Sequence, residues 1–223
     1  MNIHIDELVR SKRKTISFTI DHNGKLIIRA PYKTPIEYIK KVVEEKSKWI
    51  LTKQELVKRN MPCLQKKQYT EGEEYLYLGK SYYLKYVAGN YTGIIENTLV
   101  LPYKQIDKAE QTICKWYKKE VLRIITERVE YYSGITGIKC SSIKITNARR
   151  RWGSCSSKNG LCFTWRLVMA PLETIDYVIV HELSHVIHKN HSSSFWAAVK
   201  SIMPDYELRK KWLGKNQFIL EMF

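Results

Sequence analysis

Residues 180–191 read VHELSHVIHKNH and contain four of the six histidines in this 223-residue chain. His181 and His185 are four residues apart, so an α-helix places both imidazoles on one face, where they can bind one metal ion. Residues 175–187 are mostly apolar, which predicts that this helix is buried. Buried His and Glu side chains need compensation, and a metal ion supplies it. The stretch therefore predicts a metal centre on a core helix.

Glu182 directly follows the first of these histidines. In the HExxH pattern this carboxylate reaches a metal-bound water without ligating the metal. Imidazole ligands favour zinc, which lowers the pKa of its bound water to about 7. We expect Glu182 to act as a general base that takes a proton from this water and returns it to the leaving group. This chemistry is that of a zinc-dependent hydrolase.

The third ligand is open from the residues alone. His191 follows His185 by six positions, the spacing of the metzincin pattern HExxHxxGxxH, although His188 stands where that pattern has glycine. We favour His191 and expect the helix to stop at Lys189–Asn190, with Asn190 in a left-handed conformation. His188 is the alternative ligand; otherwise it contacts a ligand or stabilises an oxyanion. Tyr206 is a second candidate for that supporting role, and Glu207 is a weaker candidate ligand.

A second group of residues, RRRWGSCS, occupies positions 149–156. Its arginines could bind a carboxylate or phosphate, or could form a solvated edge. Gly153 would let the backbone come close beside a ring. The chain contains no CxxC pair, so we interpret Cys155 and Cys162 as small buried residues of a hairpin rather than zinc ligands. The candidate substrate-binding residues are Arg149, Arg150, Arg151, Trp152 and Ser154.

Hydrophobic spacing and turn residues predict an α+β fold. The expected strands form a hairpin at 15–20 and 25–30, two or three short antiparallel strands within 69–102, and a pair at 142–148 and 161–169. The expected helices are 36–59, ended by Met61–Pro62; 107–132, ended by Ser133–Gly134; 175–187; 193–202; and 205–213.

The chain is strongly basic, with 38 Lys and Arg against 22 Asp and Glu and a net charge of +16. Such a surface attracts polyanions, or it serves solubility alone. Tyrosines and lysines within 69–102 could stack on single-stranded nucleic acid, but we favour a half-buried sheet with tyrosines at its rim. We expect no transmembrane helix and no secretion signal. Five scattered cysteines then indicate free thiols and a cytoplasmic protein.

Three segments together resemble the YgjP-like metallopeptidase family, which is related to the SprT and WLM groups of zincins. They are RRWGSCSSKNGLCFTWRLVMAP (150–171), VIVHELSHVIHKNHSSSFW (178–196) and MPDYELRKKWL (203–213). The resemblance implies zinc held by His181, His185 and His191, a catalytic Glu182, and a minimal zincin-like domain with a small mixed or antiparallel sheet packed on the HExxH helix. Some members are described instead as nucleoside triphosphate pyrophosphatases that act on UTP.

We therefore expect a β-rich N-terminal part with one helix at 1–105 and a zincin-like metal-hydrolase domain at 106–223, or one continuous domain. A zinc metallopeptidase ranks first, with an edge strand near 162–167 holding an extended peptide or protein substrate. A UTP pyrophosphatase is the alternative, favoured by the basic charge but not by any carboxylate cluster. A nucleic-acid-associated binding protein or DNA-linked protease is the third hypothesis, with weak binding through the basic surface.

Overall fold

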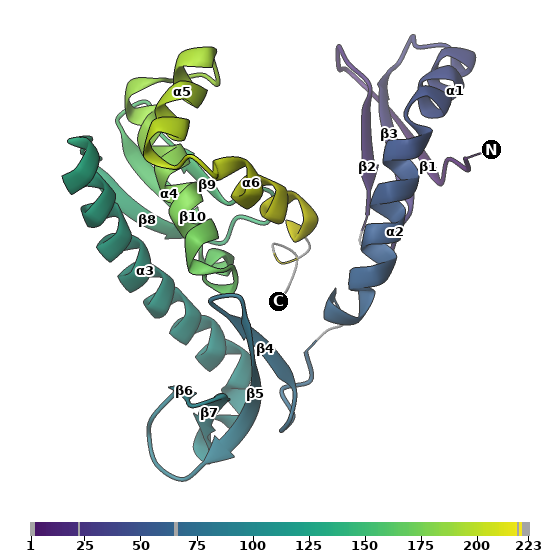
Figure 1. Ribbon diagram of the computed structural model, residues 1–223. Helices are drawn as coiled ribbons and strands as arrows, with labels where there is room; N and C mark the ends of the chain where they lie inside the picture. Colours follow the sequence, from purple (N-terminus) through teal and green to yellow (C-terminus); the bar gives the residue numbers. More distant parts are fainter. Residues whose placement is uncertain (1–2, 22, 65–66, 218, 220–223) are drawn as a thin grey trace. The chain divides into compact units, whose positions relative to one another are not determined.

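A computed structural model describes residues 3–21, 23–64, 67–217 and 219 of the chain (Figure 1). The chain divides into two compact units, 1–65 and 66–223. The boundary that we expected between residues 105 and 106 thus falls inside the second unit. There the buried Tyr117 donates a hydrogen bond of 2.7 Å to the carbonyl of Leu76, which ties the tyrosine-rich strands to the helical part that follows them.

The first unit is a three-stranded sheet with two helices. Its elements are β1 (Glu7–Ser11), β2 (Ser17–Ile20), β3 (Leu26–Pro31), α1 (Ile36–Glu45) and α2 (Ser47–Leu64). The strand order is β1-β3-β2, and the expected antiparallel hairpin is confirmed, with Gly24 at φ 81° in its turn. The core that the sheet shares with the helices consists of Leu26, Ile28, Ala30, Ile39, Val43 and Ile50.

The single helix that we expected over 36–59 is wrong in two respects. The backbone leaves helical geometry at Lys46 (φ −96°, ψ 8°), which separates α1 from α2. Helix α2 then continues to Leu64, past the stop that we expected at Met61–Pro62.

The second unit begins with a four-stranded mixed sheet. Its strands are β4 (Glu74–Tyr77), β5 (Lys80–Val87), β6 (Gly93–Ile95) and β7 (Thr98–Pro102). Their order is β4-β5-β7-β6, and β5 and β7 run parallel, so the expectation of two or three antiparallel strands is wrong. The short β6–β7 hairpin docks through β7, and this placement makes the β5–β7 pair parallel.

A 3₁₀ turn, η1 (Tyr103–Lys108), leads into the long helix α3 (Ala109–Thr136). The stop that we expected at Ser133–Gly134 is wrong, because Gly134 lies inside this helix. Helix α3 ends instead at Gly137, whose φ of 71° gives the left-handed conformation and whose N–H binds the carbonyl of Ser133. Packing of Val129 and Tyr132 in the core outweighs the low helix propensity of one glycine.

A second small sheet follows α3. It contains β8 (Ser142–Thr146), β9 (Gly153–Cys155) and β10 (Gly160–Thr164) in the order β8-β10-β9. Strand β10 is central, parallel to β8 and antiparallel to β9. The edge strand that we expected near 162–167 is therefore wrong: β9 occupies the edge, and Trp165–Met169 forms the 3₁₀ turn η2.

The remaining helices are α4 (Leu172–Ile187), α5 (Ser193–Ile202) and α6 (Tyr206–Lys215), as expected. Two contacts in the N-terminal half of α4 fix the position of this helix. The β4–β5 turn lies against Pro171, where a Cβ on Gly79 would be 2.7 Å from the proline ring. Arg128 of α3 holds Asp176 of α4 with two hydrogen bonds of 2.6 Å. The α+β fold with a small mixed sheet beside the HExxH helix is thus confirmed. No helix in the described part of the chain is long and apolar enough to span a membrane.

Candidate metal centre

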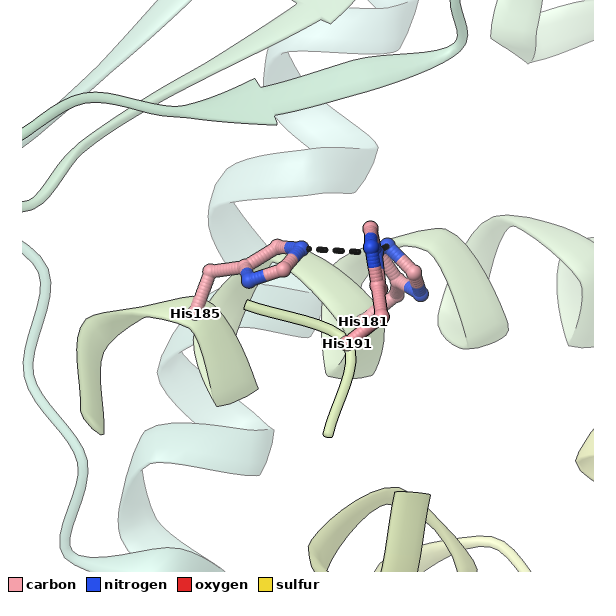
Figure 2. Close-up of side chains that lie close together, drawn as sticks. All are labelled: His181, His185 and His191. Carbon is pink, nitrogen blue, oxygen red and sulfur yellow. Dashed lines mark hydrogen bonds between the residues drawn. The ribbon is translucent and has the colours of Figure 1, made fainter. Parts of the chain in front are cut away.

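Three imidazoles converge beside the C-terminal half of α4. His181 and His185 project from the helix, and His191 reaches them from the segment that follows it (Figure 2). The Nε2 atom of His191 lies 3.0 Å from Nε2 of His181 and 3.1 Å from Nε2 of His185. One ligand atom from each histidine falls within 4.8 Å of the others, so a single ion can contact all three.

The chain turns back toward His181 and His185 directly after α4. The helix ends at Ile187, and His188 adopts extended geometry (φ −108°, ψ 99°). The left-handed Asn190 that we expected is wrong, since Asn190 is not among the described residues with positive φ. Its side chain acts instead: Oδ1 of Asn190 accepts a hydrogen bond of 3.3 Å from the backbone N–H of Ser192. This turn brings His191 to the cluster.

Two kinds of contact orient the rings. Nδ1 of His185 donates to the carbonyl oxygen of His188 at 2.9 Å, which leaves Nε2 of His185 with its lone pair. The fully buried Phe195 of α5 packs against all three imidazoles, with centroid distances of 4.5–4.9 Å. Nδ1 of His181 is buried and has no hydrogen-bond partner within the described residues, so packing orients this ring.

The environment favours the neutral form of two of the three histidines. Burial, followed by His185, His191 and Lys210, lowers the pKa of His181 to about 3. Burial, followed by His185 and Lys210, also lowers the pKa of His191. Neutral imidazoles at neutral pH present lone pairs rather than protons to an ion.

Glu182 lies on the side of α4 that faces β9. Its side chain is buried, and burial raises its pKa to about 7 against the opposing charge of Arg151. A Cβ on Gly153 would lie 2.8 Å from both Cγ and Oε1 of Glu182. Only glycine lets the edge strand pass so close to this carboxyl. The close approach that we expected of Gly153 to a ring is therefore an approach to the Glu182 carboxylate.

The family of the chain follows from a sequence match. The family model described as "YgjP-like, metallopeptidase domain" matches residues 14–216. The chain belongs to the YgjP-like family. Family membership supports a metallopeptidase and implies a metal ion.

The chain was also compared with solved structures and with curated proteins. The protein in the crystal structure of the metallopeptidase zymogen of Pyrococcus abyssi abylysin shares 21% sequence identity with this chain. That match has a TM-score of 0.39 and covers 42% of this chain and 95% of the other. No curated protein matches the chain.

The other candidates in this YgjP-like chain, His188 and Tyr206 as supporting residues and Glu207 as a weaker ligand, are not part of the histidine group. His188 contributes its backbone carbonyl to His185, while its Nδ1 lies 3.4 Å from Oγ of Ser194. Tyr206 stacks on Tyr177 and Trp196 at 6.3 and 5.3 Å, near the metal face. Glu207 accepts a hydrogen bond of 3.4 Å from the Tyr206 hydroxyl and is not part of the histidine group.

The arginines before β9 do not act as one group. Arg151 comes two residues before Gly153, which contacts Glu182, and its charge opposes the effect of burial on the Glu182 pKa. Burial, followed by the charge of Arg149, lowers the pKa of Arg166 to about 10. All three arginines at 149–151 are exposed. The structure thus brings Arg151 to the candidate site and directs Arg149 elsewhere.

The neighbours of the arginines belong to the sheet. The carbonyl of Trp152 accepts a hydrogen bond of 3.0 Å from the N–H of Thr164, and Ser154 pairs with Cys162. The hairpin that we expected around Cys155 and Cys162 is confirmed, but both side chains are half-buried rather than buried. Both are free thiols, as are Cys114 and Cys140, while the Cys63 side chain lies outside the described residues.

Sequence reasoning missed several side chains at the site. Phe195 and Trp196 pack on the imidazoles from α5, and Lys210 of α6 lies 4.1 Å from the centroid of the Trp196 ring. Their signal in the sequence is the spacing of Phe195 four residues after His191 and of Lys210 four residues after Tyr206. Such spacing is also typical of any amphipathic helix, so it does not single them out.

The tyrosine-rich strands form a sheet, as we favoured, with Tyr75 and Tyr86 buried. A cavity of about 590 Å³ lies beside them and shares no residue with the histidine cluster. Three acidic side chains, Glu71, Asp107 and Glu110, help to line it. Negative charge of this kind repels phosphates, so this face does not support stacking of nucleic acid.

Proposed function

We propose that this chain is a zinc-dependent peptidase in which His181, His185 and His191 hold the metal and Glu182 is the general base. The convergence of three imidazoles beside one buried carboxyl group carries this proposal. Family membership supports the peptidase class, and the geometry supports the assignment of roles.

The donor set fits zinc. Zinc binds imidazole nitrogen at about 2.0–2.1 Å in tetrahedral sites, which places two ligand nitrogens about 3.3 Å apart. The observed Nε2 separations of 3.0 and 3.1 Å are close to this value. Three protein ligands leave one position for substrate or water, which is the pattern of catalytic rather than structural zinc. When bound there, zinc polarises the scissile carbonyl and makes a water molecule more acidic.

Glu182 moves the proton. Its raised pKa, about 7, makes it a stronger base than an exposed glutamate, and its position against Gly153 limits the rotamers of its side chain. It accepts a proton from the attacking water and delivers that proton to the amine nitrogen of the departing peptide. A carboxylate that is exposed to solvent would perform this transfer less efficiently near neutral pH.

Strand β9 offers a binding edge for the peptide backbone. The carbonyl of Trp152 accepts a hydrogen bond from the N–H of Thr164, and the N–H of Ser156 donates to the carbonyl of Gly160. Every second residue of this segment therefore points its backbone N–H and C=O groups toward β10. The N–H and C=O groups of Gly153 and Cys155 therefore point away from β10. An extended peptide can pair with these groups and pass beside Glu182.

The decisive experiment is Glu182→Gln in the zinc-loaded protein, with a mixture of unstructured peptides as substrate and mass spectrometry as the readout. Loss of the base should lower cleavage by roughly 10²- to 10⁴-fold while zinc content stays unchanged. Glu173→Gln, which alters an exposed acid in the first turn of the same helix, should have no effect. Full activity of Glu182→Gln would exclude the proposed base.

A nucleotide pyrophosphatase is the second candidate, because Arg151 places positive charge next to Glu182. The same two variants, assayed for release of pyrophosphate from UTP, test it. Turnover of UTP that Glu182→Gln abolishes, with no peptide cleaved by the wild type, would replace the peptidase proposal.

A further inference from the structure

Three cationic side chains surround the histidine cluster and Glu182, and each comes from a different segment. Arg151 precedes β9, Lys189 follows α4, and Lys210 lies on α6. None of the three is placed in the metal or proton-transfer chemistry described above. Their positive charge favours a substrate with negative charge near the bond that is cleaved.

Lys210 is held over an aromatic ring at the metal face. Its Nζ lies 4.1 Å from the centroid of Trp196, and Trp196 stacks on His191 at 5.7 Å and 22°. The Trp196 ring also lies 5.8 Å from the ring of His181. The ammonium group is thus fixed next to two of the proposed ligands.

Lys189 is fixed near the C-terminal end of β9. Its Nζ donates a hydrogen bond of 2.5 Å to Oδ1 of Asn159, in the turn between β9 and β10. Its charge also opposes the increase in the pKa of Cys155 that burial causes. Lys189 therefore lies near the end of β9 at Cys155, whereas Arg151 comes two residues before Gly153, the end of β9 that contacts Glu182.

These cations lack acidic partners within the described part of the chain, where no ion pair joins Arg151, Lys189 or Lys210 to a carboxylate. Neighbouring cations behave differently. Arg209, adjacent to Lys210, pairs with Asp205 at 2.7 Å, and Arg128 pairs with Asp176. Arg151, Lys189 and Lys210 are therefore available to an acidic ligand.

We infer that the substrates of this peptidase carry aspartate or glutamate on both sides of the scissile bond, bound by Arg151, Lys189 and Lys210. The inference rests on the proposed function and names its substrate class. A peptide paired antiparallel to β9 would place the residues before the scissile bond near Lys189 and those after it near Arg151. Lys210 would then contact an acidic side chain from the α6 side.

The test uses two fluorogenic peptides that are identical except that one has Asp and Glu and the other has Asn and Gln around the scissile bond. The zinc-loaded wild type should show a higher kcat/KM for the acidic peptide, mainly through a lower KM, and added salt should reduce the difference. Arg151→Gln, Lys189→Gln and Lys210→Gln should each weaken the preference about two- to fivefold. Lys200→Gln, which alters an exposed lysine of α5, should not change it.

A binding measurement separates this inference from the proposed function. The zinc-loaded Glu182→Gln protein should bind the acidic peptide more tightly than its neutral analogue, as measured by fluorescence anisotropy of labelled peptides. Equal affinity for the two peptides would overturn the inference even if peptides are cleaved. So would a preference that persists when Arg151→Gln, Lys189→Gln and Lys210→Gln are combined. Acid-selective binding without cleavage by the wild type would contradict the proposed function alone. Tighter binding of UTP than of the acidic peptide would assign the cations to a nucleotide and also overturn the inference.

Discussion

Gly153 and the carboxyl group of Glu182 are in such close contact that no side chain fits between them. A Cβ on Gly153 would lie 2.8 Å from both Cγ and Oε1 of Glu182. This contact joins the edge strand β9, which we propose as the peptide-binding strand, to the proposed base on α4. The strand and the base are therefore positioned by the same contact.

Gly153→Ala should displace the Glu182 carboxyl and lower kcat for peptide cleavage by about a hundredfold, since small misplacements of a reacting group have effects of this size. Zinc content should remain that of the wild type, because the alanine methyl group does not point at the histidines. The measurement is kcat together with zinc stoichiometry.

Gly134→Ala is the matched control for this change. Gly134 lies inside α3, and a Cβ there would meet nothing within 4 Å. The variant should keep full activity and gain up to about 1 kcal/mol from higher helix propensity. Equal activity of both alanine variants would show that the Gly153 contact has no catalytic role.

His191→Ala and His188→Ala should differ in zinc affinity. His191 contributes Nε2 to the cluster, so its loss should cost more than the roughly 10- to 100-fold that loss of a supporting group costs. His188 supports His185 through its backbone carbonyl, which alanine retains. Competition with a chromogenic chelator measures both affinities. Weaker zinc binding by His188→Ala than by His191→Ala would reverse the ligand assignment.

The sequence was informative about the histidine cluster because its residues are close along the chain. Helical spacing alone places His181 and His185 on one face, and a short return segment is enough to bring His191 to them. The contact between Gly153 and Glu182 joins residues about thirty positions apart. Local spacing contains no information about such a contact, and a glycine before a hairpin has many other possible reasons.

The errors in the fold have similar causes. Strand β9 has three residues, too few for an alternating pattern, so the edge of its sheet was assigned to the central strand β10. The parallel pairing of β5 and β7 depends on how the β6–β7 hairpin docks, which no local pattern specifies. Gly134 and Gly137 are both plausible helix stops, and only tertiary packing decides between them.

Arg128→Met should destabilise the protein strongly. Arg128 binds Asp176 through two hydrogen bonds of 2.6 Å, and the Asp176 side chain is only 9% exposed. Removing the arginine leaves a buried carboxylate without its cation, which costs about 3–5 kcal/mol. Thermal unfolding should show a fall in Tm of roughly 6–20 °C for a unit of this size.

Arg123→Met provides the comparison on the same helix. Arg123 pairs with Glu120 and Glu127, but its side chain is 52% exposed, so the change should cost less than about 1 kcal/mol. A similar loss of Tm in both variants would mean that the Arg128–Asp176 pair does not clamp α4 to α3.

Acid should destabilise the metal-free protein through His181. Its pKa in the folded state is about 3, lowered first by burial, against an ordinary value of 6.5. Between these values the unfolded chain binds a proton that the folded chain does not, so the contribution of His181 to stability is greatest above pH 6.5 and falls as the pH decreases toward 3. The raised pKa of Glu182 acts in the opposite direction between pH 4.5 and 7. For one histidine the slope is at most about 1.4 kcal/mol per pH unit. Urea denaturation of chelator-treated protein from pH 7 to 5.5 measures it. His181→Asn should remove the His181 contribution, so that its pH dependence differs from that of the wild type by this slope, whereas His4→Asn, which alters an exposed histidine, should keep the wild-type dependence. The same slope in His181→Asn as in the wild type would mean that protonation of His181 does not limit the acid stability of the metal-free protein.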